Sequence, residues 1–147
     1  MKRTLVLSVL LMVLLAACGA GGEPVEQATA LLVTDGVTEK SYSLADLEAL
    51  PAAEASFNGV TYKGVVLSVL LEDAGFSPQD LSGIDAIASD GYRVPFKADL
   101  FLLPDTLVAY AQSDGPLADD DGAFRMVLPE QEGKINVRML AELRLKP

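Results

Sequence analysis

The segment Ile135-Asn136-Val137-Arg138-Met139-Leu140-Ala141-Glu142-Leu143-Arg144-Leu145 decides the fold class of this 147-residue chain. Apolar residues occupy every second position, and polar residues fill all but one of the positions between them. Only Leu140 interrupts the period of two. Such alternation is typical of a strand with one buried and one exposed face. The sequence therefore predicts that the chain ends in a half-buried strand over residues 135–145.

Upstream of this strand, short β-prone runs outnumber short helical patterns. The expected strands cover residues 28–33, 55–57, 60–62, 84–89, 93–96, 106–111 and 124–128. The expected helices cover residues 44–50, 66–74 and 98–103. We therefore predict an α+β fold with a mainly antiparallel or mixed β-sheet and a few short helices.

Three local signals mark where these elements begin and end. Ser43, followed by Asp46 three residues later, resembles the capping box that opens a helix. The pair Asn58-Gly59 is typical of a type I′ hairpin turn. Gly75 follows the helical pattern of residues 66–74 and is expected to cap its C-terminal end.

The N-terminus has the layout of a signal peptide. Lys2 and Arg3 precede an apolar run over residues 5–17, which is shorter than the ~20 residues needed to span a bilayer. The run ends in Leu15-Ala16-Ala17-Cys18, which resembles the bacterial lipobox, so we expect lipidation at Cys18. The alternative is that Cys18 is an incidental small residue at an ordinary signal-peptidase site.

These signals predict how the chain is organised and where it resides. We expect a signal peptide over residues 1–17, a lipidated flexible tether over 18–27 and one domain over 28–147. The membrane would be contacted through the lipid on Cys18. If the host has two membranes, Gly19 does not resemble an inner-membrane retention signal. That predicts the periplasmic face of the outer membrane, in the cell envelope.

Composition excludes several classes of function. After residues 1–17 are removed, nine basic residues stand against 21 acidic ones, a net charge of −12. Nucleic acid is therefore not an expected partner, because its phosphates would repel this surface. The chain has no His, and Cys18 is its one cysteine. Zinc sites of the Cys/His kind, Ser-His-Asp catalysis and disulfides are excluded.

Six short motifs occur in the order found in one known family. The first three are Val-Thr-Asp-Gly-Val at 33–37, the leading helix ending in Leu-Pro at 42–51, and Gly-Val-Val-Leu at 64–67 with Leu-Leu after it. The next three are Asp-Gly-Tyr at 90–92, Asp-Gly-Pro-Leu at 114–117 and Gly-Ala-Phe-Arg-Met-Val-Leu-Pro at 122–129.

Over about residues 31–146 the chain thereby resembles the molybdopterin-binding domain of sulfite-oxidase-type oxidoreductases. The resemblance implies that fold, with molybdopterin as the family's cofactor. In active members a cysteine thiolate ligates molybdenum, between the leading helix and the Gly-Val-Pro-Leu helix, and His and Arg hold the pterin phosphate. Here that segment, including Ser56-Phe57-Asn58, has no cysteine, and the chain has no His. We therefore predict no catalytic residue, no metal site and no bound cofactor, with molybdopterin implied by the resemblance alone.

Three arginines are the candidate ligand-binding residues: Arg93, Arg125 and Arg138. A guanidinium binds phosphate or carboxylate through two parallel hydrogen bonds, and Arg125 matches the family's arginine position. The alternative is that each arginine is solvated or pairs with one of the acids.

Two further groups have a functional and a structural interpretation. Asp119-Asp120-Asp121 contains hard oxygen ligands for calcium, but an acidic surface loop fits better because EF-hand spacing is missing. Tyr62, Tyr92 and Tyr110 could line a pocket, although aromatic residues in strands usually belong to the core.

Three functions remain open. The first is a membrane-anchored periplasmic binding or accessory module without a catalytic metal, which would act with a periplasmic or inner-membrane redox protein. The second is an oxidoreductase component that binds molybdopterin through Arg93, Arg125 and backbone groups. The third is a lipoprotein that delivers a small anion to a transporter. Fold alone does not choose among these functions.

Overall fold

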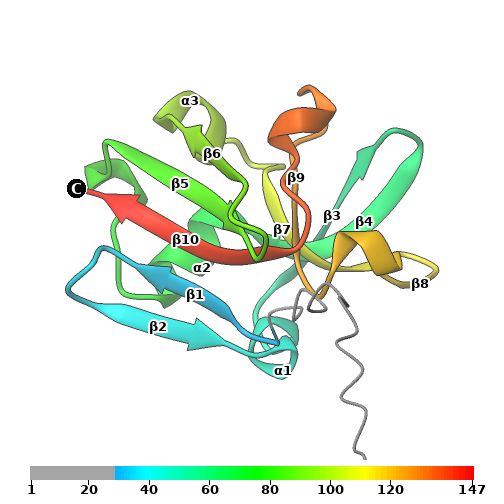
Figure 1. Ribbon diagram of the computed structural model, residues 1–147, viewed down its shortest axis with the longest axis horizontal. Helices are drawn as coiled ribbons and strands as arrows, with labels where there is room; N and C mark the ends of the chain where they lie inside the picture. Colours follow the sequence, from blue (N-terminus) through cyan, green and yellow to red (C-terminus); the bar gives the residue numbers. More distant parts are fainter. Residues whose placement is uncertain (1–28) are drawn as a thin grey trace, which may run out of the picture.

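A computed structural model describes residues 29–147, which form two five-stranded β-sheets connected by short helices (Figure 1). The predicted signal peptide, Cys18 and the tether lie outside the described residues, so these three predictions stand as predictions.

The first sheet has the strand order β2-β1-β10-β5-β6. Its strands are β1 (Leu31–Thr34), β2 (Glu39–Tyr42), β5 (Gly83–Ala88), β6 (Arg93–Phe96) and β10 (Leu140–Lys146). β1 pairs with β10 in parallel, and the other neighbours pair antiparallel. The sheet is therefore mixed, and the beginning and end of the domain lie side by side in it.

The second sheet has the strand order β3-β4-β7-β8, and β9 also pairs with β7. Its strands are β3 (Ala52–Phe57), β4 (Val60–Val66), β7 (Leu107–Gln112), β8 (Gly115–Pro116) and β9 (Arg125–Val127). All its strand pairs are antiparallel. The two sheets together confirm the predicted fold class.

The helices are short. They are α1 (Leu44–Glu48), α2 (Leu67–Asp73) and α3 (Ala98–Phe101), with 3-10 turns η1 (Pro78–Asp80), η2 (Asp119–Asp121) and η3 (Gly133–Ile135). Within residues 29–147, no helix has the length and apolar character needed to cross a bilayer.

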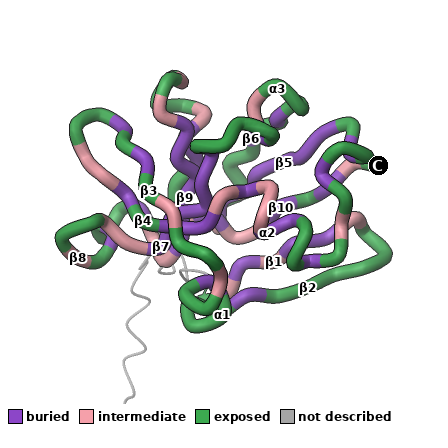
Figure 2. Tube along the Cα trace, turned by 180° about the vertical axis from the view of Figure 1, so that it is seen from behind, coloured by how far each residue is buried: buried purple, intermediate pink, exposed green. Residues whose placement is uncertain are grey.

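The main hydrophobic core is formed by the first sheet, by α2, which covers one face of that sheet, and by residues of the second sheet (Figures 1 and 2). Leu70 and Leu71 of α2 and Leu143 of β10 are fully buried in it. A smaller core forms on the second sheet around Phe57 and Tyr62. Burial of apolar side chains at ~25 cal/mol per Å² drives the folding of such a domain.

Local signals in the sequence account for several turns and caps. The Ser43 side chain accepts from the Asp46 amide, and the Asp46 carboxylate accepts from the Ser43 amide, which confirms the capping box. Asn58 and Gly59 both have positive φ, at 49° and 80°, as a type I′ turn requires. Gly75 follows α2 with φ 91°, as predicted for a helix cap.

The predicted strand over residues 135–145 is wrong in its first half. The strand β10 begins at Leu140, and residues 133–135 form the turn η3 instead. Met139 has φ 48°, which ends an extended run. Leu140, which broke the sequence alternation, lies where the register between β10 and β5 shifts. The sequence irregularity therefore marks a β-bulge.

The edge strand β2 carries no strand signal in its sequence. Glu39, Lys40 and Ser41 are exposed, and only Tyr42 is buried. Charged side chains on an edge strand discourage pairing with another chain. Pairing with β1, not side-chain periodicity, therefore makes this segment a strand.

A polar cluster fastens β2 to the end of α2. The Asp73 carboxylate accepts from Lys40 Nζ at 2.7 Å and from the Tyr42 hydroxyl at 2.6 Å. Lys40 and then Tyr42 hold the pKa of Asp73 below its ordinary value of 3.8. Burial, followed by Asp73, raises the pKa of the Tyr42 hydroxyl above its usual range, so Tyr42 remains a donor.

We expect Asp73→Asn to lower the free energy of unfolding at pH 7 by roughly 0.2–1 kcal/mol, as for other exposed ion pairs. As pH falls, the unfolded chain takes up the Asp73 proton first, because the folded pKa is the lower one. The stabilisation that Asp73 provides is therefore fully present above the unfolded-state pKa of 3.8. It is lost as the pH falls through the lower pKa of the folded state. Urea unfolding at several pH values checks this. A difference between wild type and variant that persists at low pH would contradict it.

Candidate functional site

A groove of about 420 Å³ opens between the β5–β6 turn, η2 and residues 133–139. We call it the Tyr92 groove, because Tyr92 lies in its wall with 48% of its surface exposed. The ionisable residues in its wall, besides Tyr92, are Asp90, Asp120, Lys134 and Arg138. The groove therefore presents an aromatic ring beside two acids and two cations.

The β5–β6 turn positions Tyr92. Gly91 has φ 88°, a conformation that favours glycine, and the Asp90 carboxylate accepts from the Tyr92 amide at 2.9 Å. The Tyr92 hydroxyl then donates to the Lys134 carbonyl oxygen at 2.7 Å. Two segments about 40 residues apart in the chain are thereby joined across one end of the groove.

Asn136 holds the opposite wall and is a residue that sequence reasoning missed. It is 2% exposed, and its Oδ1 accepts from the Leu128 amide at 2.7 Å. Its Nδ2 donates to the carbonyl oxygens of Leu128 and Glu132 at 3.3 and 3.1 Å. An amide side chain pairs in this way with backbone that has no strand partner. In the alternating pattern Asn136 looks like an exposed strand residue.

Met139 lies in the groove wall with φ 48°, outside the usual region for a residue with a side chain. Its amide donates to the Asp121 carbonyl oxygen at 2.7 Å, and its carbonyl oxygen accepts from the Ser89 amide at 2.9 Å. A Cβ on Gly122 would lie 2.9 Å from the Met139 Cα, so the two backbones are in close contact. Local strain of this kind concentrates at binding sites.

The Ser89 hydroxyl oxygen is buried and has no hydrogen-bond partner among the described residues. Ser89 lies between Ala88 and Asp90, which both line the Tyr92 groove. Buried polar atoms in native proteins nearly always have a partner. Ser89 itself does not line the groove, so its hydroxyl is an unsatisfied group beside the groove and not a ligand contact.

Arg138 is the one predicted arginine that lies in this groove. Its Nη1 donates to the Asp120 carboxylate, and its Nε lies 3.5 Å from Asp121 Oδ1. The side chain remains 56% exposed. Arg138 can therefore reach a ligand, in competition with Asp120.

Arg125 is buried. Its Nη1 donates to Asp121 Oδ1 at 2.6 Å and to the Tyr62 hydroxyl at 2.9 Å. The guanidinium carbon lies 4.6 Å from the centre of the Tyr62 ring and 5.8 Å from that of Phe57. The side chain is 4% exposed, so its charge is balanced inside the protein. Asp121 is the shared carboxylate that links Arg125 to Arg138.

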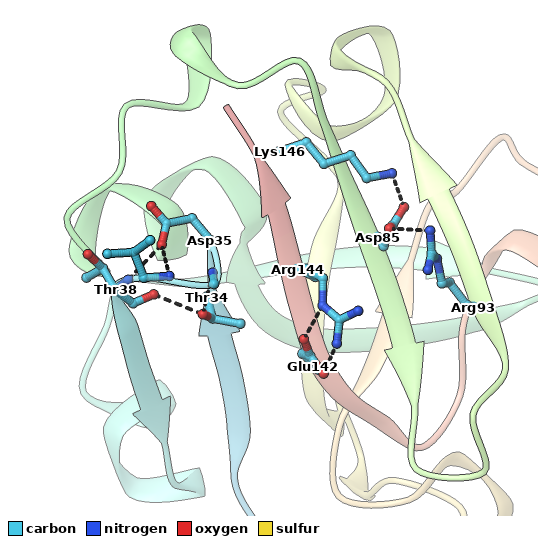
Figure 3. Close-up of polar contacts among 10 residues, drawn as sticks. Thr34, Asp35, Thr38, Asp85, Arg93, Glu142, Arg144 and Lys146 are labelled. Carbon is cyan, nitrogen blue, oxygen red and sulfur yellow. Dashed lines mark hydrogen bonds and ion pairs between the residues drawn. The ribbon is translucent and has the colours of Figure 1, made fainter.

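Arg93 lies apart from the other two arginines. Its Nη2 is 2.8 Å from Asp85 Oδ2, and the Nζ of Lys146 is 2.6 Å from Asp85 Oδ1 (Figure 3). Asp85 is 1% exposed on β5, between β6 and β10. The three residues form a polar bridge across three strands.

The remaining predicted residues fall into two groups. Tyr92 lines the groove, whereas Tyr62 and Tyr110 belong to the two cores. Asp119, Asp120 and Asp121 form η2, where Asp120 pairs with Arg138 and Asp121 with Arg125. Among residues 29–147, no three His, Cys, Asp or Glu side chains are grouped so that they could hold a metal ion.

The comparisons with known proteins agree with this fold. The family described as Oxidoreductase molybdopterin binding domain matches residues 23–147. The chain belongs to that family. The sulfane dehydrogenase SoxCD from Paracoccus pantotrophus is a similar solved structure, with a TM-score of 0.70 at 20% sequence identity.

At this sequence identity, the similarity shows that the two chains share the fold of the molybdopterin-binding domain. The match covers 87% of this chain and 40% of the SoxCD chain, so this protein spans less than half of that chain. No curated protein matches the sequence.

The residues of this family member do not fit the metal part of molybdopterin. Thiolate sulfur suits a redox molybdenum centre, and residues 29–147 contain no cysteine and no histidine. Ser56, Phe57 and Asn58 lie where β3 meets its turn, and the Phe57 ring is in the smaller core. A Cβ on Gly133, in the groove wall, would lie 3.8 Å from Phe57 Cζ. An apolar ring therefore stands close to the groove in the segment where the family's thiolate is expected.

The groove does offer cations for a phosphate, as the organic part of molybdopterin would need. Arg138 is engaged by Asp120, and Lys134 Nζ lies 2.6 Å from Glu132. Both side chains are more than half exposed. A phosphate that binds to these two cations would therefore compete with carboxylates of the protein.

Proposed function

We propose that this member of the molybdopterin-binding domain family is a lipid-anchored binding or accessory module of the cell envelope, without a catalytic metal. The proposal rests on the side chains that the domain offers as ligands for a metal cofactor. The domain has neither the thiolate nor the histidine with which active family members hold the cofactor. The Tyr92 groove is the binding site of this module.

The chemistry of the groove supports binding more than catalysis. The Glu132 carboxylate beside Lys134 raises the pKa of the Lys134 ammonium group, so Lys134 stays a cation in the groove wall. Tyr92, Lys134 and Arg138 can hold a planar or anionic ligand by stacking and by charge-assisted hydrogen bonds.

The proposed cellular location rests on the sequence of the N-terminus. A lipobox ending in Cys18 predicts attachment to the membrane through an acyl chain, and the Gly-rich residues after it suit a flexible tether. The domain carries a net negative charge, so we assign the attachment to the lipid and not to a basic patch. The periplasmic face of the outer membrane is the proposed location in a host with two membranes.

A second candidate function is the binding of a pterin without molybdenum, as part of an oxidoreductase with unusual ligands. The two exposed cations in the groove wall, Lys134 and Arg138, favour it, because a guanidinium or an ammonium group can bind a phosphate. Arg138 would contact the phosphate of such a ligand.

The experiment is cofactor analysis of the full chain, expressed in a host that makes molybdenum cofactor and purified from its membranes. We expect far less than one molybdenum per chain, because no thiolate is present. We also expect no pterin fluorescence, because carboxylates of the protein already pair with Lys134 and Arg138. A family member that has the cysteine, prepared in parallel, is the positive control. The variant Cys18→Ser is expected to leave the membrane fraction.

Each result decides a part of the proposal. Near-equimolar molybdenum would overturn the non-catalytic function. Pterin without molybdenum would establish the second candidate instead. Retention of Cys18→Ser in the membrane fraction, as strongly as wild type, would overturn the lipid anchor.

A further inference from the structure

A second concavity shares no lining residue with the Tyr92 groove. It has a volume of about 270 Å³ and is lined by residues 103–105 and 128–131. We call it the Leu103 notch. Small-molecule pockets are usually ~300–1,000 Å³, so the notch suits an inserted side chain more than a cofactor.

The apolar surface at the notch is exposed in a way that is uncommon in this domain. Leu102 and Leu103 follow α3 directly and are 36% and 37% exposed. Pro104 and Pro129 add further apolar surface to the notch. Adjacent exposed leucines next to a concavity are a feature of binding surfaces, whereas isolated exposed apolar residues are ordinary.

The notch also carries charge that the protein does not balance. Asp105 and Glu130 both line it and are exposed, and no basic residue lines it. Within residues 29–147, neither carboxylate forms an ion pair. Uncompensated carboxylates around an apolar notch are complementary to a basic segment that has an apolar residue.

Both walls of the notch are held in place. Thr106 is fully buried. Its hydroxyl donates to the Leu100 carbonyl oxygen at 2.8 Å, and its amide donates to the Leu103 carbonyl oxygen. On the opposite wall, Leu128 exchanges two hydrogen bonds with the Asn136 side chain. A preformed surface loses little conformational entropy when a partner binds.

We infer that the Leu103 notch is a docking site for a basic segment of a partner protein that inserts one large apolar side chain between Leu103 and Pro129. Asp105 and Glu130 contact the partner's Lys or Arg residues. Residues 29–147 carry nine basic residues and 19 acidic ones, once Lys2, Arg3, Glu23 and Glu26 are set aside. This net charge attracts a cationic partner from a distance, and the notch then selects it by its apolar side chain.

A second copy of this chain is a poorer occupant, because the same acidic surface would repel it. A nucleic acid is excluded on the same ground. The site lies outside the Tyr92 groove, so this inference stands whether or not the groove binds a ligand.

The test is a titration of the full chain in detergent with the peptide Lys-Lys-Leu-Lys-Lys, followed by the amide resonances of the protein. We expect shifts confined to residues 102–106 and 128–131. Replacing the peptide's Leu by Ser is expected to weaken binding about tenfold, since burial of Leu contributes most of the apolar affinity. The variant Asp105→Asn/Glu130→Gln is expected to weaken binding roughly three- to tenfold.

The matched control is Glu54→Gln/Asp114→Asn, which makes the same change of charge at two exposed carboxylates on β3 and in the β7–β8 turn. It is expected to bind as wild type does, apart from a small loss of long-range attraction. Equal weakening in both double variants would show general charge attraction and overturn the site. So would shifts spread over the whole acidic surface, or no binding. Concentration-dependent shifts at the notch without peptide would assign it to a second copy of the chain.

Discussion

Gly64→Ala is expected to lower the free energy of unfolding by about 3 kcal/mol and Tm by roughly 10–20 °C. A Cβ at this position would lie 2.2 Å from the Val108 carbonyl oxygen and 2.6 Å from the Ala109 Cα. Both atoms belong to the backbone of β7, so no side-chain rotation can relieve the contact. Gly64 also lies at the register shift between β4 and β7, where the two strands cannot separate without breaking the second sheet.

Gly115→Ala is the matched control for this substitution. Gly115 is also in a strand, β8, but a Cβ there meets no atom within 4 Å and its φ is not positive. We expect a change below about 0.5 kcal/mol. Thermal and urea unfolding of the two variants make the measurement. Equal stability of the two would contradict the close approach of β4 and β7.

Asp121→Asn is expected to lower the free energy of unfolding by roughly 3–5 kcal/mol, because it leaves the buried Arg125 charge without its counter-ion. Asp121 and Arg125 are both 4% exposed, and Tyr62 and a backbone carbonyl are the other partners of the guanidinium. Neutral acceptors do not compensate a buried full charge. The effect therefore comes from electrostatics in a dry site and not from loss of volume.

Asp120→Asn tests the same change one residue away. Asp120 pairs with Arg138, but its side chain is 68% exposed, so a loss of at most about 1 kcal/mol is expected. The variant Asp121→Asn/Arg125→Met should recover part of the stability lost in Asp121→Asn, because it removes the unpaired charge. If Asp121→Asn were as stable as Asp120→Asn, Arg125 would have to be solvated, and the buried ion pair would be disproved.

The aspartates of η2 show what the sequence alone can and cannot predict. Asp119, Asp120 and Asp121 are adjacent and identical, and together they look like an acidic loop. In the fold Asp120 is exposed, whereas Asp121 is buried and neutralises Arg125. Nothing in the local sequence distinguishes the two, because Asp121 pairs with Arg125 of β9 and Asp120 pairs with Arg138, which precedes β10.

Asn136 shows the same limit within a single element. Its position in the alternating run indicates an exposed strand residue. The chain joins the sheet only at Leu140, however, and the Asn136 side chain is buried against Leu128. The strand prediction fails there because no neighbouring ladder pairs with residues 135–139. Their backbone groups bond instead to residues 132 and 133, to Met126 of β9, to Asp121 of η2 and to Ser89. Leu140, the break in the alternation, was the available signal of that change.

The sequence by itself determined the features that depend on a few neighbouring residues. These include the Ser43 cap, the Asn58-Gly59 turn, the strand-rich α+β fold and the lack of thiolate and imidazole ligands in the domain. Such features follow from backbone preference, side-chain periodicity and composition, which act locally. Only the tertiary structure decided that Arg125 is buried, that Arg138 lines a groove, and that Asp105 and Glu130 flank a notch. These arrangements bring together residues far apart in the chain, and the packing of the two sheets sets their distances.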